Sequence, residues 1–466
     1  MPELQRSLAE VRATLALAGP LVAAQLLAMS MGVVDTWLAG NLGTEVLAAV
    51  AIGTQIWVLA MLLVFGLLLA LTPTAAQLDG AGRRDAVGAV FRQGLWMALV
   101  IGLLLAWAMR YSVPLLEWLA VDPAIIPEAR RFINAISFGL PALALATACA
   151  KLSDGLSLTR PAMYFSALAL LVLTPLAWAL MYGRLGLPAL GAAGAGYAHA
   201  IAMWVQALAF LIYVVRRERY RSAGLFSRFD WPDLRIQLEL LRTGAPMALA
   251  LFMEGSLFVL VALMVGSLGE VTTAAHAIAI TVASITFMVP LGIAMAATVR
   301  VGNAVGRRDA RGIVRAAWAG LALVLVTQSV SIALMVWLPR PIAALFSADP
   351  EVVALAVTLL MFAAIFQFSD GIQTLSAGLL RGLNDTAIPA LITIVAYWGI
   401  GLPVARWLGL ERGLGAPGLW IGLIAGLSAA ALLLALRFIR RARVMLRDGV
   451  PEGLLAHAPP PLVEIR

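Results

Sequence analysis

The stretch Gly82-Arg83-Arg84-Asp85-Ala86 recurs without change as Gly306-Arg307-Arg308-Asp309-Ala310, 224 residues further along the chain. Four more pairs follow in the same order at offsets of 224 to 227 residues: Pro20 and Pro246, Gly40-Asn41-Leu42-Gly43 and Gly266-Ser267-Leu268-Gly269, Asp122-Pro123 and Asp349-Pro350, and Gly191-Ala192-Ala193-Gly194 and Gly415-Ala416-Pro417-Gly418. Self-similarity at a fixed period marks a duplicated architecture. The sequence therefore predicts two homologous halves.

Long apolar runs fill the sequence between these anchors. The chain is 62% hydrophobic and only 12% charged, with a mean hydropathy of +0.95. A run of 18 or more apolar residues is long enough to cross a bilayer as a helix. We therefore expect an all-α polytopic membrane protein. The expected spans are 14–38, 47–71, 91–109, 132–150, 162–182, 191–215, 244–266, 274–297, 314–338, 355–379, 387–408 and 416–437.

Twelve spans divide into six for each half of the chain. Because six is even, each half enters and leaves on the same side, so the repeat is parallel and its pseudo-two-fold axis runs along the membrane normal. We expect an N-terminal six-helix bundle over 1–215 and a basic cytoplasmic linker over 216–243. A C-terminal six-helix bundle over 244–440 and a cytoplasmic tail over 441–466 follow. Two such bundles around a central cleft suit alternating access.

The basic residues predict the orientation. Most of the 33 Lys and Arg lie on one side of the predicted spans. The other side holds seven: Arg110, Arg130, Arg131, Arg184, Arg340, Arg406 and Arg412. The positive-inside rule then places both termini in the cytoplasm. The net charge of +8 is explained by this topology and by contact with anionic lipid, so nucleic acid is not an expected partner.

Three carboxylates lie inside apolar runs: Asp35, Glu254 and Asp370. An ionisable group in hydrocarbon costs roughly 2.5–3.5 kcal/mol on insertion scales, and such residues usually serve ion or substrate movement. By the offset, Val261 stands opposite Asp35, and Ala28 stands opposite Glu254. A carboxylate required by the fold should tend to appear in both halves. We therefore interpret these three as functional groups on a symmetric scaffold.

The predicted depths place Glu254 and Asp370 at a similar level of the second bundle, where they could share one site. Two carboxylates buried close together cannot both ionise cheaply, so the pair is expected to hold a proton or a cation such as Na+. Gln367 is a supporting polar group one turn from Asp370, and Asp154 is another beside Lys151. Alternatives remain for these acids. Asp35 could reach the outer interface, Glu254 and Asp370 could form a structural contact, and Asp154 could be a solvated boundary residue.

Large aromatic and sulfur side chains near the predicted cleft are candidates for stacking with a flat cationic ligand. They are Phe252, Phe287, Met288, Phe366, Tyr397 and Trp398. Ordinary packing is the alternative for each of them. His199 and His276 stand alone in their spans and are expected to pack. No pattern for a structural metal or a catalytic triad occurs, so we expect neither an enzyme nor a cofactor.

Several motifs together resemble the multidrug and toxic-compound extrusion (MATE) family, and most closely its NorM-like branch. The first-helix signature is Val34-Asp35-Thr36, followed by Ala39 to Gly43 and by Leu47-Ala48-Ala49-Val50. Further matches are Pro73 to Gln77 with Gly80, Asp154 to Pro161, Ala274-Ala275-His276, Arg300-Val301-Gly302 and Leu380-Arg381-Gly382. The resemblance runs from about Thr14 to Arg440.

The resemblance implies a V-shaped pair of bundles in a bacterial inner membrane. It implies a rocker-switch antiporter that exports organic cations such as dyes and antibiotics in exchange for H+ or Na+, and that confers antibiotic resistance. It carries over Asp35 as the ion or substrate acid of the first bundle, and Glu254 and Asp370 as the cation site of the second. A monomer is expected.

This chain departs from the family pattern in ways that bear on the coupling ion. Leu173 and Ala177 stand where relatives often have asparagines, and Phe366 stands where they can have a tyrosine. These losses remove oxygen ligands and favour H+ over Na+. A lipid or lipid-linked oligosaccharide flippase of the same superfamily is the alternative, but arginines would be expected in its cavity.

Overall fold

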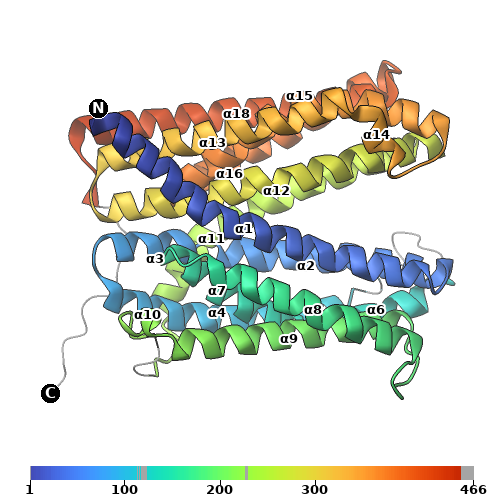
Figure 1. Ribbon diagram of the computed structural model, residues 1–466, viewed down its shortest axis with the longest axis horizontal. Helices are drawn as coiled ribbons and strands as arrows, with labels where there is room; N and C mark the ends of the chain where they lie inside the picture. The colour runs from blue at the N-terminus through green and yellow to red at the C-terminus, as the bar shows by residue number, and fades with distance from the viewer. Residues whose placement is uncertain (1, 113, 115, 117–122, 226–228, 453–466) are drawn as a thin grey trace. The chain divides into compact units, whose positions relative to one another are not determined.

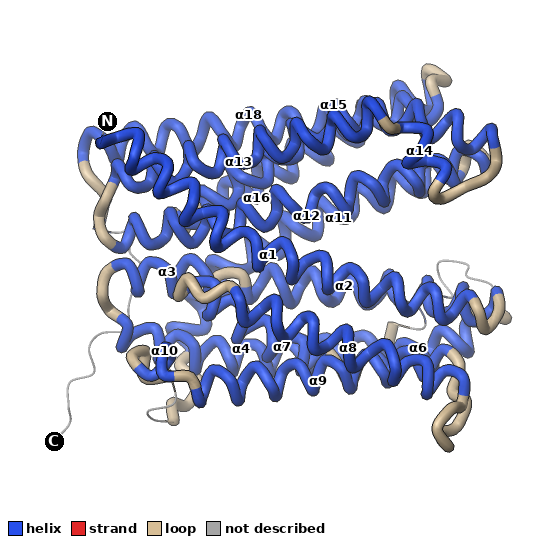
Figure 2. Tube along the Cα trace, viewed as in Figure 1, coloured by secondary structure: helices blue, strands red, loops and turns tan. Residues whose placement is uncertain are grey.

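The computed structural model describes residues 2–112, 114, 116, 123–225 and 229–452. Its regular secondary structure is helical, with turns and loops between the helices (Figure 1). The described residues contain no strand (Figure 2). Eleven of the described helices are long and apolar enough to cross a membrane, or twelve if one bent pair is counted as a single span. The predicted all-α polytopic class is confirmed.

The helices divide between the two halves of the chain. The first half contains α1 (Pro2–Gly40), α2 (Thr44–Leu68), α3 (Leu71–Gly80), α4 (Arg84–Arg110), α6 (Ile126–Ser137), α7 (Leu140–Gly155), α8 (Arg160–Tyr182), α9 (Ala192–Arg216) and the short α10 (Glu218–Arg221). The second half contains α11 (Leu234–Gly266), α12 (Glu270–Gly306), α13 (Ala310–Trp337), α14 (Pro339–Ala344), α15 (Pro350–Gly382), α16 (Ala387–Ile394), the π-helical η1 (Val395–Gly401), α17 (Leu402–Arg406), the π-helical η2 (Trp407–Glu411) and α18 (Gly415–Asp448).

The turns between helices repeat along with the sequence. Gly43 before α2 has a φ of 128°, and Gly269 before α12 has a φ of 110°. These backbone conformations favour glycine because it has no Cβ. Ser157 after α7 and Asn384 after α15 are both left-handed, with φ values of 60° and 56°. The duplication therefore extends to single backbone positions.

The two halves differ in their fourth and fifth spans. In the first half the fourth span is broken into α6 and α7, which meet at an angle of 43°. Gly139 lies at the break and Pro141 in the first turn of α7, and a proline cannot continue the hydrogen bonding of a preceding helix. The matching α15 is unbroken. The fifth span of the second half instead contains η1 and η2, and π-helical turns are frequent at functional sites.

Several helices extend beyond the predicted spans. α11 has 33 residues and α12 has 37, whereas about twenty suffice to cross the hydrocarbon core. The predicted linker over 216–243 is therefore helical from Leu234 onward, and the predicted tail is helical as far as Asp448. The remainder of that tail, from residue 453, lies outside the described residues.

The chain forms two compact units, and the boundaries between them fall inside α1 and α11. The first unit is Ala23–Ala248, and the second comprises the described residues up to Val22 and from Leu249 onward. Small residues bring helices together within each unit. A Cβ on Gly194 of α9 would lie 2.7 Å from the Leu180 carbonyl of α8, and one on Gly378 of α15 would lie 2.6 Å from the Ala294 carbonyl of α12. Close approach at small residues is typical of packing between membrane helices.

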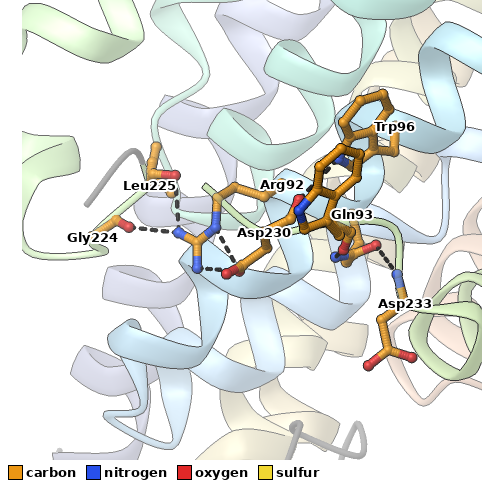
Figure 3. A network of polar contacts seen from close by, with 8 residues as sticks. Arg92, Gln93, Trp96, Gly224, Leu225, Asp230 and Asp233 are labelled. Carbon is orange, nitrogen blue, oxygen red and sulfur yellow. Dashed lines mark hydrogen bonds and ion pairs between the residues drawn. The ribbon is translucent and has the colours of Figure 1, made fainter. Parts of the chain in front are cut away.

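The segment between α10 and α11 is bound to α4 within the first unit (Figure 3). The Arg92 guanidinium contacts Asp230 Oδ2 at 2.6 and 2.7 Å and donates to the Gly224 carbonyl at 2.8 Å. Gln93 and Trp96 donate to the backbone carbonyls of Trp231 and Asp230, at 2.8 and 3.0 Å. The described residues of this connection are therefore fixed on α4.

Candidate functional site

Asp35, the acid of the first unit, is paired with a histidine. Asp35 on α1 is 5% exposed and His199 on α9 is 7% exposed. His199 Nδ1 lies 2.9 Å from Asp35 Oδ2. The other oxygen, Oδ1, is buried and has no hydrogen-bond partner among the described residues. The structure thus does not turn Asp35 out to the membrane surface, and His199 is not an isolated packing residue.

Aromatic side chains from two further helices contact His199 and the α1 backbone near Asp35. The Trp57 ring of α2 lies edge to face with the His199 ring, at 5.8 Å between centroids. The Tyr182 hydroxyl of α8 donates to the Leu38 carbonyl of α1 at 2.9 Å. The first contact orients the imidazole, and the second fixes the α1 segment that carries Asp35. Four helices therefore position the pair.

The second unit holds Glu254 on α11 and Asp370 on α15. Asp370 is 3% exposed, and Glu254 is half-buried. The two carboxylates are close enough to repel each other electrostatically, whereas the Arg381 guanidinium attracts Glu254. None of the ion pairs formed by the described residues involves any of these three. The Coulomb interaction with Arg381 could not be predicted from helical spacing alone.

Gln367 lies one turn from Asp370, as expected, but its amide is engaged elsewhere. Its oxygen accepts from Gln328 Nε2 of α13 at 2.8 Å, and its nitrogen donates to Thr286 Oγ1 of α12 at 2.7 Å. This fully buried amide joins three helices. Sequence reasoning missed Gln328 and Thr286 because each lies on another helix.

Tyr397 and Trp398 on η1 face the region of the two acids. Trp398 Nε1 donates to the carbonyl of Met253, the residue before Glu254, at 3.2 Å. Tyr397 is fully buried, and its hydroxyl has no hydrogen-bond partner in the part of the chain that is described. It interacts electrostatically with both Glu254 and Asp370.

The other predicted aromatic residues lie in different surroundings. Phe366 is 3% exposed and packs edge to face against Phe258 and Trp420, with 6.1 Å between centroids in each pair. Phe252, Phe287, Met288 and Trp398 are partly exposed. Phe366 and Tyr397 thus belong to a packed core, and the remaining four offer accessible apolar surface.

Asp154 is buried, which excludes the solvated alternative. It is 1% exposed and lies 3.7 Å from Lys151 Nζ, one turn earlier on α7. Ser153 Oγ lies 2.8 Å from the Tyr220 hydroxyl and links α7 to α10. The described residues contain no group of three or more His, Cys, Asp or Glu that could hold a metal ion.

Fold and site together define a class, a multi-pass helical membrane protein with carboxylates buried inside its spans. The sequence profile of the MatE family matches residues 20–179 and, again, residues 246–407. One family thus matches each half of the chain separately, in agreement with the predicted repeat. The chain belongs to the MATE family and is a membrane transport protein rather than an enzyme.

Relatives match over nearly the whole chain. The probable multidrug resistance protein NorM of Xanthomonas campestris pv. campestris is 46% identical over 446 residues, covering 96% of this chain and 97% of the relative. Multidrug resistance protein PmpM of Pseudomonas aeruginosa is 41% identical, covering 94% and 93%. The crystal structure of the eukaryotic MATE transporter AtDTX14 matches the fold with a TM-score of 0.85 at 22% identity, covering 95% of this chain and 99% of that one.

Proposed function

We propose that this protein is a multidrug efflux antiporter that exports organic cations in exchange for H+. The observation that carries the proposal is the burial of Asp35 and Asp370 inside otherwise apolar spans, with the half-buried Glu254 beside Asp370. Negative charge inside the membrane favours a cationic substrate. Such charge is energetically costly at that depth, and residues that carry it usually serve ion or substrate movement. The names of the NorM and PmpM relatives support drug efflux.

The side chains around the acids favour a proton over sodium. A cation site needs several oxygen ligands, whereas a proton site needs only a carboxylate. The Gln367 amide is bound to Gln328 and Thr286, so it is not free to ligate an ion beside Asp370. Phe366 supplies no oxygen. These two side chains therefore add no oxygen ligand at Asp370, which favours a proton there over Na+.

The family and the charge pattern also support a location and an orientation for this transporter. We propose a bacterial inner membrane with both termini in the cytoplasm, because the basic residues concentrate on that side of the predicted spans. Alternating access then moves the substrate outward while protons enter. A charge crossing the membrane is worth about 2.3 kcal/mol per 100 mV, which adds to the driving force of the pH gradient.

Expression in a pump-deficient bacterium tests the proposal. We expect cells that make the protein to accumulate less ethidium and to tolerate more of it than cells with an empty vector. A matched control is the triple variant Asp35→Asn, Glu254→Gln and Asp370→Asn, made at equal membrane abundance. Equal accumulation in vector and wild-type cells would contradict drug export.

A further inference from the structure

We propose that His199 carries the proton that the first unit exchanges for an organic cation, and that Asp35 holds that cation. This inference rests on the proposed antiport and assigns its proton to a residue other than the carboxylate. It starts from the 2.9 Å contact between His199 Nδ1 and Asp35 Oδ2 and from the unpartnered Asp35 Oδ1. Both side chains are more than nine-tenths buried.

The geometry divides the two roles between the two oxygens of Asp35. A carboxylate only accepts hydrogen bonds, so the ring nitrogen donates to Oδ2 and holds the imidazole in one tautomer. Oδ1 then remains as an acceptor for a further donor or positive charge. The second ring nitrogen of His199 can gain or lose a proton while the contact to Oδ2 stays in place.

The net charge of the pair follows from the state of that second nitrogen. With a neutral imidazole the pair carries one negative charge, and it attracts an organic cation to Oδ1. With a protonated imidazole the pair is neutral overall, and this attraction is lost. A proton on His199 and a cation at Asp35 therefore compete for one negative charge, which produces exchange without requiring Asp35 itself to be protonated.

Other ionisable groups on the surrounding helices do not compensate the charge of the pair. Lys151 pairs with Asp154 on α7, Glu128 pairs with Arg131 on α6, and the Tyr182 hydroxyl on α8 donates to a backbone carbonyl. The other side chains of this kind on α2, α6, α8 and α9 that are exposed to the surface are Glu45, Arg130, Arg160, Tyr164, Tyr197 and Arg216, and the partly buried Tyr213 of α9 packs against Tyr220. Among the described residues, no other ion pair includes Asp35 or His199.

Nuclear magnetic resonance of histidine rings tests the assignment on the purified full-length protein in detergent. The chain has three histidines, so the His199 signal can be assigned by comparison with a His199→Gln sample. Its chemical shift is followed against pH to obtain the midpoint of the titration, with and without a cationic ligand. Saturating tetraphenylphosphonium should lower the midpoint by about one pH unit, which corresponds to a tenfold coupling.

Two variants complete the test. In Asp35→Asn, tetraphenylphosphonium should no longer move the His199 midpoint. In His199→Gln, whose amide can still donate to Asp35, the slope of log affinity against pH should fall by up to about one, because one linked proton is lost. The matched control is His276→Gln. His276 Nδ1 accepts from Trp420 Nε1 at 3.2 Å in the second unit, and its loss should leave that slope unchanged.

The outcomes separate this inference from the proposed function. If the protein binds and exports tetraphenylphosphonium while the His199 midpoint stays fixed, the assignment is overturned and the antiport stands. If the cation is neither bound nor exported, both are overturned. Where His199→Gln fails to fold, the His199 signal is assigned by elimination with His276→Gln and His457→Gln, and the wild-type titration still decides the question.

Discussion

Asp154 and Arg381 occupy equivalent positions in the two halves and carry opposite charges. Each immediately precedes the glycine that ends its helix, Gly155 in α7 and Gly382 in α15. Asp154 forms an ion pair with Lys151, whereas Arg381 has no ion pair among the described residues and a buried Nε without a hydrogen-bond partner. The positive charge of Arg381 instead acts on Glu254.

This relationship predicts that the charge of Arg381 contributes to transport by the second unit. Arg381→Gln removes the positive charge that acts on Glu254, whereas Arg381→Lys keeps it. We expect drug efflux from vesicles, at matched protein abundance, to fall in Arg381→Gln and to stay near wild type in Arg381→Lys. An equal loss in both variants would show that charge is not the cause.

Each of the three acids inside the spans should be required for efflux. Asp35→Asn, Glu254→Gln and Asp370→Asn should each reduce ethidium efflux at least about tenfold, because each removes a negative charge used for exchange. Efflux rates at matched protein abundance, with insertion checked by fractionation, provide the measurement. Glu351→Gln at the start of α15 is an exposed control and should retain efflux. Wild-type efflux in all three acid variants would remove these acids from the mechanism.

The contact between Arg92 and Asp230 should stabilise the first unit. Asp230→Ala leaves a guanidinium that is 9% exposed without its counter-charge, and we expect a loss of about 2–3 kcal/mol. Thermal unfolding in detergent and faster protease cleavage near Asp230 would report it. Glu128→Gln is the control, since the ion pair of Glu128 with Arg131 is largely exposed and should contribute less than about 1 kcal/mol. Equal effects of the two changes would contradict a stabilising role for the contact between Arg92 and Asp230.

The contact between α12 and α15 should not tolerate a larger residue at Gly378. A Cβ there would lie 2.6 Å from the Ala294 carbonyl, and Gly378 itself accepts a hydrogen bond from Thr298. Gly378→Ala should therefore cost about 1–3 kcal/mol, seen as a lower unfolding temperature. At Gly266 no atom lies within 4 Å of the added carbon, so Gly266→Ala should be close to neutral. A neutral Gly378→Ala would show that the helices can separate at little cost.

Sequence patterns predicted the helices and the repeat because these depend on local properties. Apolar runs define spans, and repeated turn residues such as Gly43 and Gly269 give the two halves the same connections. The same patterns predicted spans shorter than several of the helices, since α11 begins at Leu234, before the predicted start at residue 244. Hydropathy marks where a helix meets hydrocarbon, and the helix itself continues into the polar region.

The partners of the candidate site residues could not be predicted in the same way. His199 lies 164 residues from Asp35, and nothing on α9 itself indicates which acid its ring meets. Gln328 and Thr286 likewise reach the second-unit site from other helices. The π-helical turns η1 and η2 left no signal in the apolar pattern. These contacts arise from packing between helices, which spacing along a single helix does not reveal.

Proteoliposomes with an imposed pH gradient and no sodium test the central claim most directly. The purified protein is reconstituted, and uptake of tetraphenylphosphonium against its concentration gradient is followed with the membrane potential clamped at zero. We predict uptake that depends on the pH gradient and is abolished by a protonophore. Absence of uptake under the pH gradient, together with uptake restored by a sodium gradient, would contradict proton-coupled export.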